Sequence, residues 1–390
     1  MSLQLWPRLN SFCKTITMKY ILMKKTIAFL SVTGFWPKTK ESTKTRAFCI
    51  LFSSSFLLFG SLGYLIVYRK FGSDDIDSIE TATSHFGVLY FMFFWILKRD
   101  GLVHIVNLLS DFSKFGEPRF FNDRNRQLDY LLQYCIFVLS VATGGVFLCP
   151  IIFVKNCEMV KQEKNLTKVC GLVSNVWAPF DYSEYPMKRV VSLWESYCCF
   201  INFGCGGIMS FTMIKTMEHL HIRVEQLKDM FPDVVNEKNL AVRKQKLEKW
   251  VKYHLHLYDI GELMNNTYRY CLSVIVLCVG ILFGCIGIST MQPGSSHNSL
   301  FLFMGWFQSI CILCMVGQRL LDVFLSVGVM AYDSAWYEKD VDFQKAVLMI
   351  MIRARRPVLI YAGPFTNLSH LLILGVLQTS YSYINLLNAK

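Results

Sequence analysis

Seven uncharged apolar runs, each about twenty residues long, constrain the fold of this chain more than any other feature. A helix needs roughly 20 residues to cross a hydrocarbon core about 30 Å thick. Inside lipid, backbone amides must be satisfied within their own segment, so these runs are predicted to be transmembrane α-helices. Glu195 is the only acidic or basic residue inside them. The runs are 47–67, 81–97, 130–154, 190–214, 271–291, 300–316 and 368–387.

The basic residues divide unequally between the segments that connect these runs. Segments 1–46, 98–129, 215–269 and 318–356 hold 31 of the 40 Lys and Arg residues. Cytoplasmic segments accumulate Lys and Arg, so topology rather than nucleic-acid binding accounts for the net charge of +12. The distribution predicts a cytoplasmic N-terminus and, after seven spans, an extracellular C-terminus. The N-terminal segment also lacks the long apolar run of a cleavable signal peptide.

Two inner segments are predicted to continue as helices below the membrane. In 215–269, residues with apolar surface recur every three or four positions on both sides of Phe231-Pro232, as they do on one helix face. Residues 343–352 form a second helical stretch, which Arg353 to Pro357 separate from the last span. The expected division of the chain is a cytoplasmic segment 1–46, six spans over 47–317, a cytoplasmic segment 318–356, and the last span with its tail over 357–390.

The second outer segment, 155–189, carries features expected on the extracellular side. Cys157 and Cys170 both lie in it. An oxidising environment allows a disulfide there, but the sequence leaves their pairing open. Asn165 begins an Asn-Leu-Thr sequon and is the predicted glycan acceptor. The sequons at Asn265 and Asn367 lie at a cytoplasmic position and at the inner edge of the last span.

Four segments near the C-terminus occur in the order and spacing of one family's signature. They read AYDSAWY at 331–337, RARRP at 353–357, AGP at 362–364 and TSYSYINLL at 379–387. Upstream, APFDY at 178–182 and the pair Tyr253-His254 add to the match. Together these segments resemble the insect odorant receptor family. The inverted seven-helix topology of that family agrees with the distribution of basic residues.

The resemblance implies a multi-pass receptor in the plasma membrane of sensory neurons. Odorant-binding members assemble with a co-receptor subunit into heterotetrameric, ligand-gated, non-selective cation channels. Each subunit contributes its last helix to the central pore. The co-receptor carries a much longer inner loop before the fifth span, whereas here that loop is only 215–269. The chain therefore resembles an odorant-binding subunit, with a co-receptor, a small volatile and the lipid bilayer as its expected partners.

Three other classes of membrane protein fit the sequence less well. Gustatory receptors share the architecture, but their closing motif ends in a Gln-Phe pair, and here the chain reads Asn385-Leu386-Leu387. A rhodopsin-like metabotropic receptor would carry Asp-Arg-Tyr after span three and Asn-Pro-x-x-Tyr in span seven, and neither motif occurs there. Many transporters show inverted repeats, and this sequence has no such symmetry. The sequence gives no support for an enzyme, and no cofactor is expected.

The last span is the candidate pore helix. Leu377, Tyr381, Ile384 and then Leu387 or Asn388 recur at helical spacing. The resemblance implies that Ile384 and Leu387 lie near the gate, where an apolar ring closes a pore by excluding water. The alternative is a face that packs on lipid or on a neighbouring helix.

The ligand site is expected between the outer halves of spans two, three, four and six. Ligand pockets are concave and mostly apolar with few polar groups, although aromatic stripes of this kind more often form plain core. A small, mostly neutral volatile is the expected ligand, because only Glu195 offers a strong charge, and that carboxylate alternatively reaches headgroups or water. The predicted ligand residues are His85, Val88, Leu89, Tyr90, Thr143, Phe147, Tyr197, Phe200, Ile201, Phe303, Trp306 and Ile310.

Two histidine pairs raise the question of a metal site. His219 and His221, like His254 and His256, are two positions apart, which points their rings to different sides of a helix. No Cys or acidic residue completes a recognisable ligand set. No metal site is therefore expected.

Overall fold

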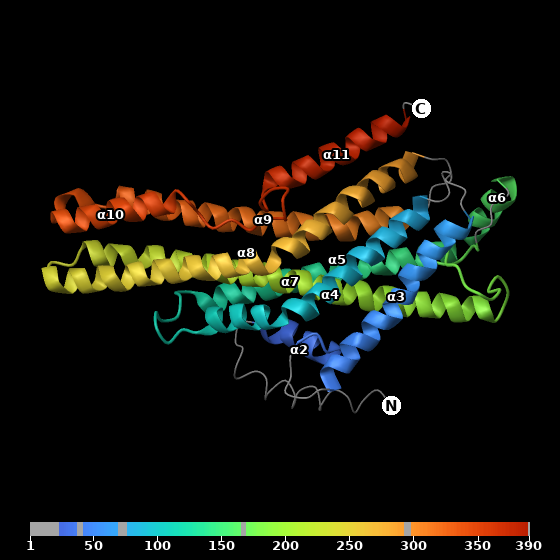
Figure 1. The fold of residues 1–390 in the computed structure, drawn as a ribbon, viewed down its shortest axis with the longest axis horizontal. Helices are drawn as coiled ribbons and strands as arrows, with labels where there is room; N and C mark the ends of the chain where they lie inside the picture. Colours follow the sequence, from blue (N-terminus) through green and yellow to red (C-terminus); the bar gives the residue numbers. More distant parts are fainter. Residues whose placement is uncertain (1–22, 37–41, 69–75, 165–168, 292–297, 389–390) are drawn as a thin grey trace.

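The computed structural model describes residues 23–36, 42–68, 76–164, 169–291 and 298–388 as an elongated assembly of long helices (Figure 1). No β-strand occurs in these ranges, where Tyr361 and Asn367 form an isolated bridge. The helices are α2 (Lys24–Thr33), α3 (Ser42–Tyr68), α4 (Ile76–Ser110), α5 (Phe121–Ile152), α6 (Val154–Lys164), α7 (Met187–Val235), α8 (Leu240–Met291), α9 (Asn298–Asp333), η3 (Trp336–Glu338), α10 (Val341–Ala354) and α11 (His370–Asn388).

Each of the seven predicted spans lies within one helix, apart from one or two residues at the ends of some spans. In chain order these helices are α3, α4, α5, α7, α8, α9 and α11. Within the described ranges, α3, α5, α7, α8 and α9 are long and apolar enough to cross a membrane. The prediction of an all-α membrane fold is confirmed, while the cytoplasmic N-terminus and extracellular C-terminus stay predictions.

Several helices continue well beyond the predicted spans at one end of the molecule. There α7 packs against α8 and α9, and α10 packs against α9, so the four form one long stack (Figure 1). We call residues 215–269 and 317–354 the inner bundle. Its α10 covers the predicted stretch 343–352 and begins at Asp340, whose carboxylate accepts a hydrogen bond from Phe343 N (3.3 Å).

The break between α7 and α8 differs in position from the one predicted at Phe231-Pro232. Pro232 lies within the last turn of α7, and the turn follows at 236–239. A proline near a helix end removes a single backbone hydrogen bond, so α7 continues past it to Val235. Asn239 then starts α8, because its Oδ1 accepts a hydrogen bond from Ala241 N (3.0 Å).

The helices differ sharply in how much of their apolar surface is covered. α8 packs against α4, α7, α9 and α11, and its side chains form much of the core. By contrast, α3 and α5 leave large apolar side chains such as Phe52, Phe59 and Phe137 exposed. Exposed apolar rows of this kind suit contact with lipid tails.

Candidate ligand cavity

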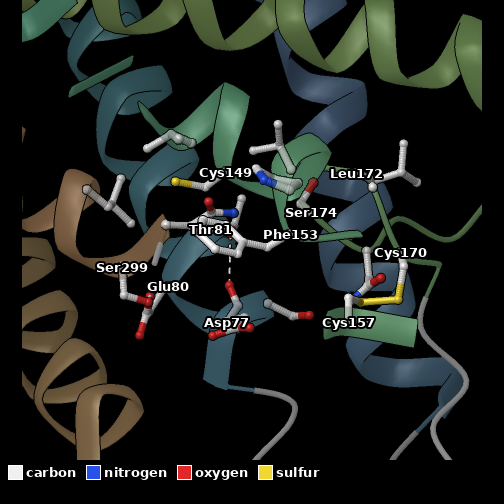
Figure 2. Close-up of a pocket in the computed structure, with 18 of the residues that line it drawn as sticks. Asp77, Glu80, Thr81, Cys149, Phe153, Cys157, Cys170, Leu172, Ser174 and Ser299 are labelled. Atoms are coloured by element: carbon white, nitrogen blue, oxygen red, sulfur yellow. Dashed lines mark hydrogen bonds between the residues drawn. A yellow bond between two sulfur atoms is a disulfide. The ribbon is translucent and has the colours of Figure 1, made fainter. Parts of the chain in front are cut away.

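A cavity of about 330 Å³ is lined by residues from the start of α4, the end of α5 and the start of α9, and these helix ends lie opposite the inner bundle (Figure 1). Residues of α4, α5, α6, α7 and α9 line it together with the connecting segment 169–175 (Figure 2). We call it the outer cavity, because the predicted topology puts this end on the extracellular side. Ligand pockets commonly measure roughly 300–1,000 Å³, so it has room for a small organic molecule.

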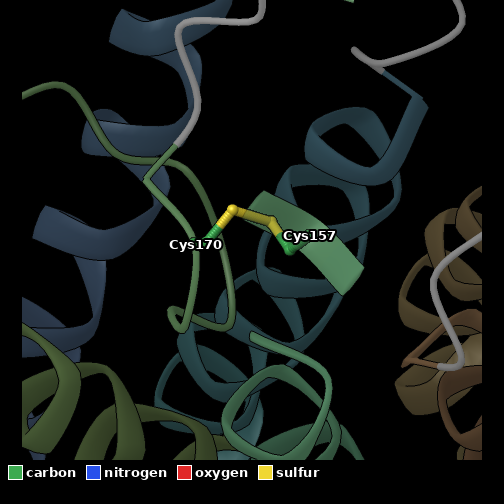
Figure 3. The surroundings of a disulfide bond; sticks show 2 residues. All are labelled: Cys157 and Cys170. Atoms are coloured by element: carbon green, nitrogen blue, oxygen red, sulfur yellow. A yellow bond between two sulfur atoms is a disulfide. The ribbon is translucent and has the colours of Figure 1, made fainter. Parts of the chain in front are cut away.

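A disulfide holds one wall of the outer cavity. Cys157 of α6 and Cys170 of segment 169–175 are bonded (Figure 3), so the pairing that the sequence left open occurs. Both cysteines line the cavity. The bond therefore fixes the segment against α6. Asn165, the predicted glycan acceptor between them, lies outside the described residues.

Glu195 of α7 anchors the same segment from another direction. Its side chain is fully buried, and its carboxylate accepts hydrogen bonds from Val173 N (3.1 Å) and Ser174 Oγ (2.9 Å). The expectation that Glu195 reaches headgroups or water is therefore wrong, because segment 169–175 folds back over it. Glu195 is also not among the residues that line the cavity.

Two other carboxyl groups do line the outer cavity, both from the first turns of α4. Glu80 Oε2 accepts a hydrogen bond from Ser299 Oγ of α9 (2.6 Å). Asp77 Oδ1 accepts one from Ser289 Oγ of α8 (3.3 Å). The two serine Oγ atoms are 3.3 Å apart, so one polar network joins three helices at this wall. The expectation that Glu195 offers the only strong charge is wrong, because Asp77 and Glu80 precede the uncharged run.

His85 is the predicted ligand residue that the structure brings to the cavity. Its ring is buried, with Nδ1 3.3 Å from Asn202 Nδ2 and Nε2 4.0 Å from Cys199 Sγ, both on α7. Asn202 Oδ1 in turn accepts a hydrogen bond from Ser54 Oγ of α3 (2.6 Å). The ring of this α4 residue is therefore oriented by α7, and Asn202 links that contact to α3.

The other eleven predicted ligand residues do not line the cavity. Some belong to packed interfaces: Trp306 Nε1 donates to Ser84 Oγ (2.9 Å), and Phe303 stacks on Phe307. Tyr197 and Phe200 are exposed on the outside of α7. Val88, Leu89 and Ile310 are buried, while Tyr90, Thr143, Phe147 and Ile201 are half-buried.

On α5, the cavity wall is formed by neighbours of the predicted residues. Val146, Cys149 and Pro150 line it, rather than Thr143 and Phe147. The α5 sequence is apolar all round within its span, so hydrophobic periodicity carries no signal for the face that turns inward. On α4, the sequence does give a signal for Asp77 and Glu80, because they are the last charged residues before the uncharged run 81–97.

The candidate pore helix, α11, lies against α8 (Figure 1). Tyr381 is 63% exposed, whereas Ile384 reaches toward α8, where a Cβ on Gly287 would lie 2.0 Å from Ile384 Cδ1. Leu377 is exposed to a smaller extent. Leu387 and Asn388 belong to α11 by backbone, and their side chains lie outside the described residues.

Three of the four paired histidines, His219, His254 and His256, lie against aromatic rings, whereas His221 lies 3.9 Å from the Glu225 carboxylate. His254 lies between the rings of Trp250 and Tyr258, at centroid distances of 5.1 Å and 5.0 Å. Burial, with a smaller contribution from the Arg353 guanidinium, lowers the pKa of His254 to about 4. The ring is therefore neutral at pH 7. Among the described residues, no group of three or more His, Cys, Asp or Glu side chains is arranged to hold a metal ion.

A family model and individual relatives of known sequence indicate the same family for this chain. The family model described as 7tm odorant receptor matches residues 73–381. Odorant receptor 85c of Drosophila melanogaster is 21% identical over 389 residues, covering 94% of this chain and 98% of the relative. Odorant receptor 85b of the same fly is 24% identical over 400 residues, with the same coverage. Both relatives are matched along nearly their whole length.

Comparison with solved structures gives the same fold. The insect olfactory receptor OR5 from Machilis hrabei, solved in complex with eugenol, superposes with a TM-score of 0.78 at 14% sequence identity. The match covers 95% of this chain and 99% of that receptor. A second structure of the same receptor gives a TM-score of 0.73 at 13% identity. At these identities the likeness shows a shared fold.

Proposed function

Because this chain belongs to the odorant receptor family, we propose that it is the odorant-binding subunit of a heteromeric, ligand-gated, non-selective cation channel. Family membership makes it a multi-pass membrane receptor rather than an enzyme. Its site of action is the plasma membrane of sensory neurons. The observation that carries the proposal is the outer cavity, enclosed by four long helices in a chain of this family.

The ligand in this proposal is a small volatile that binds in the outer cavity. Val146, Phe153 and Leu302 supply apolar wall, and burial of apolar ligand surface contributes about 25 cal/mol per Å². The Machilis receptor, which shares the fold, was solved in complex with eugenol, and this supports a small organic ligand here. The disulfide and Glu195 hold segment 169–175 in place beside the bound molecule.

The link from the cavity to the pore runs through α8 in this proposal. Ser289 of α8 belongs to the polar network at the cavity wall. Two residues earlier, Gly287 receives the side chain of Ile384 from α11. A shift of α8 on ligand binding therefore acts directly on α11, which lines the pore with Tyr381, Ile384, Leu387 and Asn388.

Current recording tests the proposed function directly. The chain is expressed in cells with and without a co-receptor subunit and exposed to an odorant panel. We expect odorant-gated cation current only with the co-receptor, since the short inner loop marks an odorant-binding subunit. Robust odorant currents from the chain alone contradict the heteromeric assembly, and silence in both settings despite surface expression contradicts the channel function.

The topology is tested by tags on intact cells. With 31 of the 40 basic residues in the predicted cytoplasmic segments, a tag at Met1 is expected to need permeabilisation before an antibody reaches it. A tag after Lys390 is expected to be reached without permeabilisation. The opposite labelling overturns the proposed orientation.

The pore assignment is tested by Ile384→Asn. A polar side chain in an apolar constriction admits water, so we expect higher basal current or altered cation permeability ratios. The change is graded, because this subunit supplies only part of the pore wall. Leu372→Asn is the control in the same helix: Leu372 is buried in the subunit core, so this change is expected to lower surface expression. Wild-type permeation by both variants at matched surface expression removes Ile384 from the pore.

A further inference from the structure

Two buried polar atoms, both in residues that line the outer cavity, have no hydrogen-bond partner. They are Ser78 Oγ and Glu80 Oε1, both from the first turns of α4. Their side chains are 1% and 2% exposed, so bulk water does not solvate them freely. Buried polar atoms are nearly always paired, and leaving one unpaired is costly. The unpaired oxygen of Glu80, a carboxyl group in this wall, points to a ligand that supplies a donor.

The charged residues that line the outer cavity indicate which kind of donor group the ligand carries. Among the described residues that line the cavity, Asp77 and Glu80 carry carboxyl groups, and none is Lys or Arg. The Lys188 ammonium of α7 approaches Gly171 without lining the cavity. A wall of this composition favours a cation over an anion, because a buried carboxylate is stabilised by an opposite charge.

Structural roles account for Asp77 but only partly for Glu80. Asp77 lies in the first turn of α4, where the helix dipole stabilises a negative charge, and it accepts from Ser289 Oγ. Glu80 lies one turn further in, and Ser299 Oγ satisfies only its Oε2. Figure 2 shows Asp77, Glu80 and Ser299 together at the same side of the cavity. Glu80 Oε1 is left for a ligand.

We propose that the outer cavity selects volatile amines, with the protonated nitrogen on Glu80 and the apolar body against Val146, Phe153 and Leu302. An ammonium group has three donors and no acceptor. It pairs with Glu80 Oε1. This ligand class differs from the neutral volatile that the sequence alone predicts. The inference rests on the proposed function, since it names the ligand of the same channel.

The test is current recording from the full chain with a co-receptor, using a linear primary amine and the primary alcohol of equal chain length. We expect the wild-type receptor to respond to the amine at a concentration about tenfold lower than to the alcohol, which corresponds to about 1.4 kcal/mol. Glu80→Gln keeps the shape of the side chain and removes its charge. It is expected to raise the half-maximal amine concentration at least about tenfold and to change the alcohol response less than about twofold. Glu163→Gln removes an exposed carboxylate on α6 and is expected to leave both responses unchanged.

The outcomes separate this inference from the proposed function. Equal shifts for amine and alcohol in Glu80→Gln, or no shift for either, assign Glu80 a structural role and overturn amine selection. If Glu80→Gln does not reach the cell surface, the wild-type comparison decides, and a stronger response to the alcohol overturns the inference. If the receptor responds to neutral volatiles but not to amines, the result supports the proposed function and overturns amine selection. Absence of any odorant current counts against both.

Discussion

Along α8, the inner bundle is filled by large aromatic side chains, whereas the opposite end beside α4 and α9 encloses the outer cavity. In the inner bundle, Trp250 and Tyr253 are fully buried. Trp250 Nε1 donates to Leu227 O (2.7 Å), and Tyr253 Oη donates to Gln226 Oε1 (2.8 Å). At the other end, smaller polar side chains such as Ser78, Thr81 and Ser174 line an open cavity instead of filling it.

The contrast shows how one set of helices combines a rigid part with a responsive one. Close packing of large rings gives the inner bundle a single arrangement, since any shift forfeits many contacts at once. Ligand sites are drawn from regions of lower local stability. The cavity end therefore depends on a few specific ties, namely the Cys157–Cys170 bond, Glu195 and the Asp77–Ser289–Ser299–Glu80 network.

The largest effect is expected from truncating the inner core with Trp250→Ala. The change removes the hydrogen bond to Leu227 O and the packing of the indole against Phe231, whose ring centroid is 5.1 Å away. Removal of a buried tryptophan destabilises a protein by about 3–5 kcal/mol. We expect a clear fall in the Tm of the detergent-solubilised receptor and a loss of surface expression.

A matched control lies two residues away. Lys252 is exposed and pairs with Glu248 (2.7 Å), so Lys252→Ala is expected to leave the Tm nearly unchanged. If Trp250→Ala matches this control, the inner bundle is less tightly packed than the structure indicates, and the contrast with the cavity end disappears.

An intermediate effect is expected from removing the disulfide at the cavity end with Cys157→Ser and Cys170→Ser together. Closing a loop of this length stabilises the folded state by about 3 kcal/mol in the chain-entropy model. Because α6 and segment 169–175 lie at the periphery, we expect reduced odorant potency with a smaller fall in Tm than for Trp250→Ala. Cys49→Ser, which changes an exposed free cysteine, is the control and is expected to have no effect. If the odorant potency of the double variant is unchanged, the disulfide that holds segment 169–175 does not contribute to ligand binding.

The smallest effect is expected from Glu195→Ala. The change leaves Val173 N and Ser174 Oγ without their acceptor, which costs about 1–3 kcal/mol for buried groups. Hydrogen exchange of residues 169–175 is expected to accelerate, while the amides of the inner bundle keep their protection. Glu184→Ala, at an exposed position before α7, serves as the comparison. Equal acceleration in both regions contradicts the view that Glu195 acts only on this segment.

The sequence by itself determined the all-α membrane fold, the order of its long helices, and the family. Uncharged runs of this length have one stable form in lipid, because only a helix satisfies its own backbone there. The helical stretch at 343–352 was also predictable, since α10 is amphipathic and has a capping Asp340. The signature segments near the C-terminus indicated the family that the match over residues 73–381 confirms.

Only the tertiary structure decided which side chains face the cavity. A transmembrane helix is apolar on every side, so periodicity does not distinguish the face toward lipid from the face toward a neighbour. The choice of Val146 and Cys149 over Thr143 and Phe147 therefore depends on how α5 packs against the other helices. The same holds for Glu80 and Ser299, which are 219 residues apart in sequence. Their contact exists because α4 and α9 both pack against α8, and no local sequence pattern records that packing.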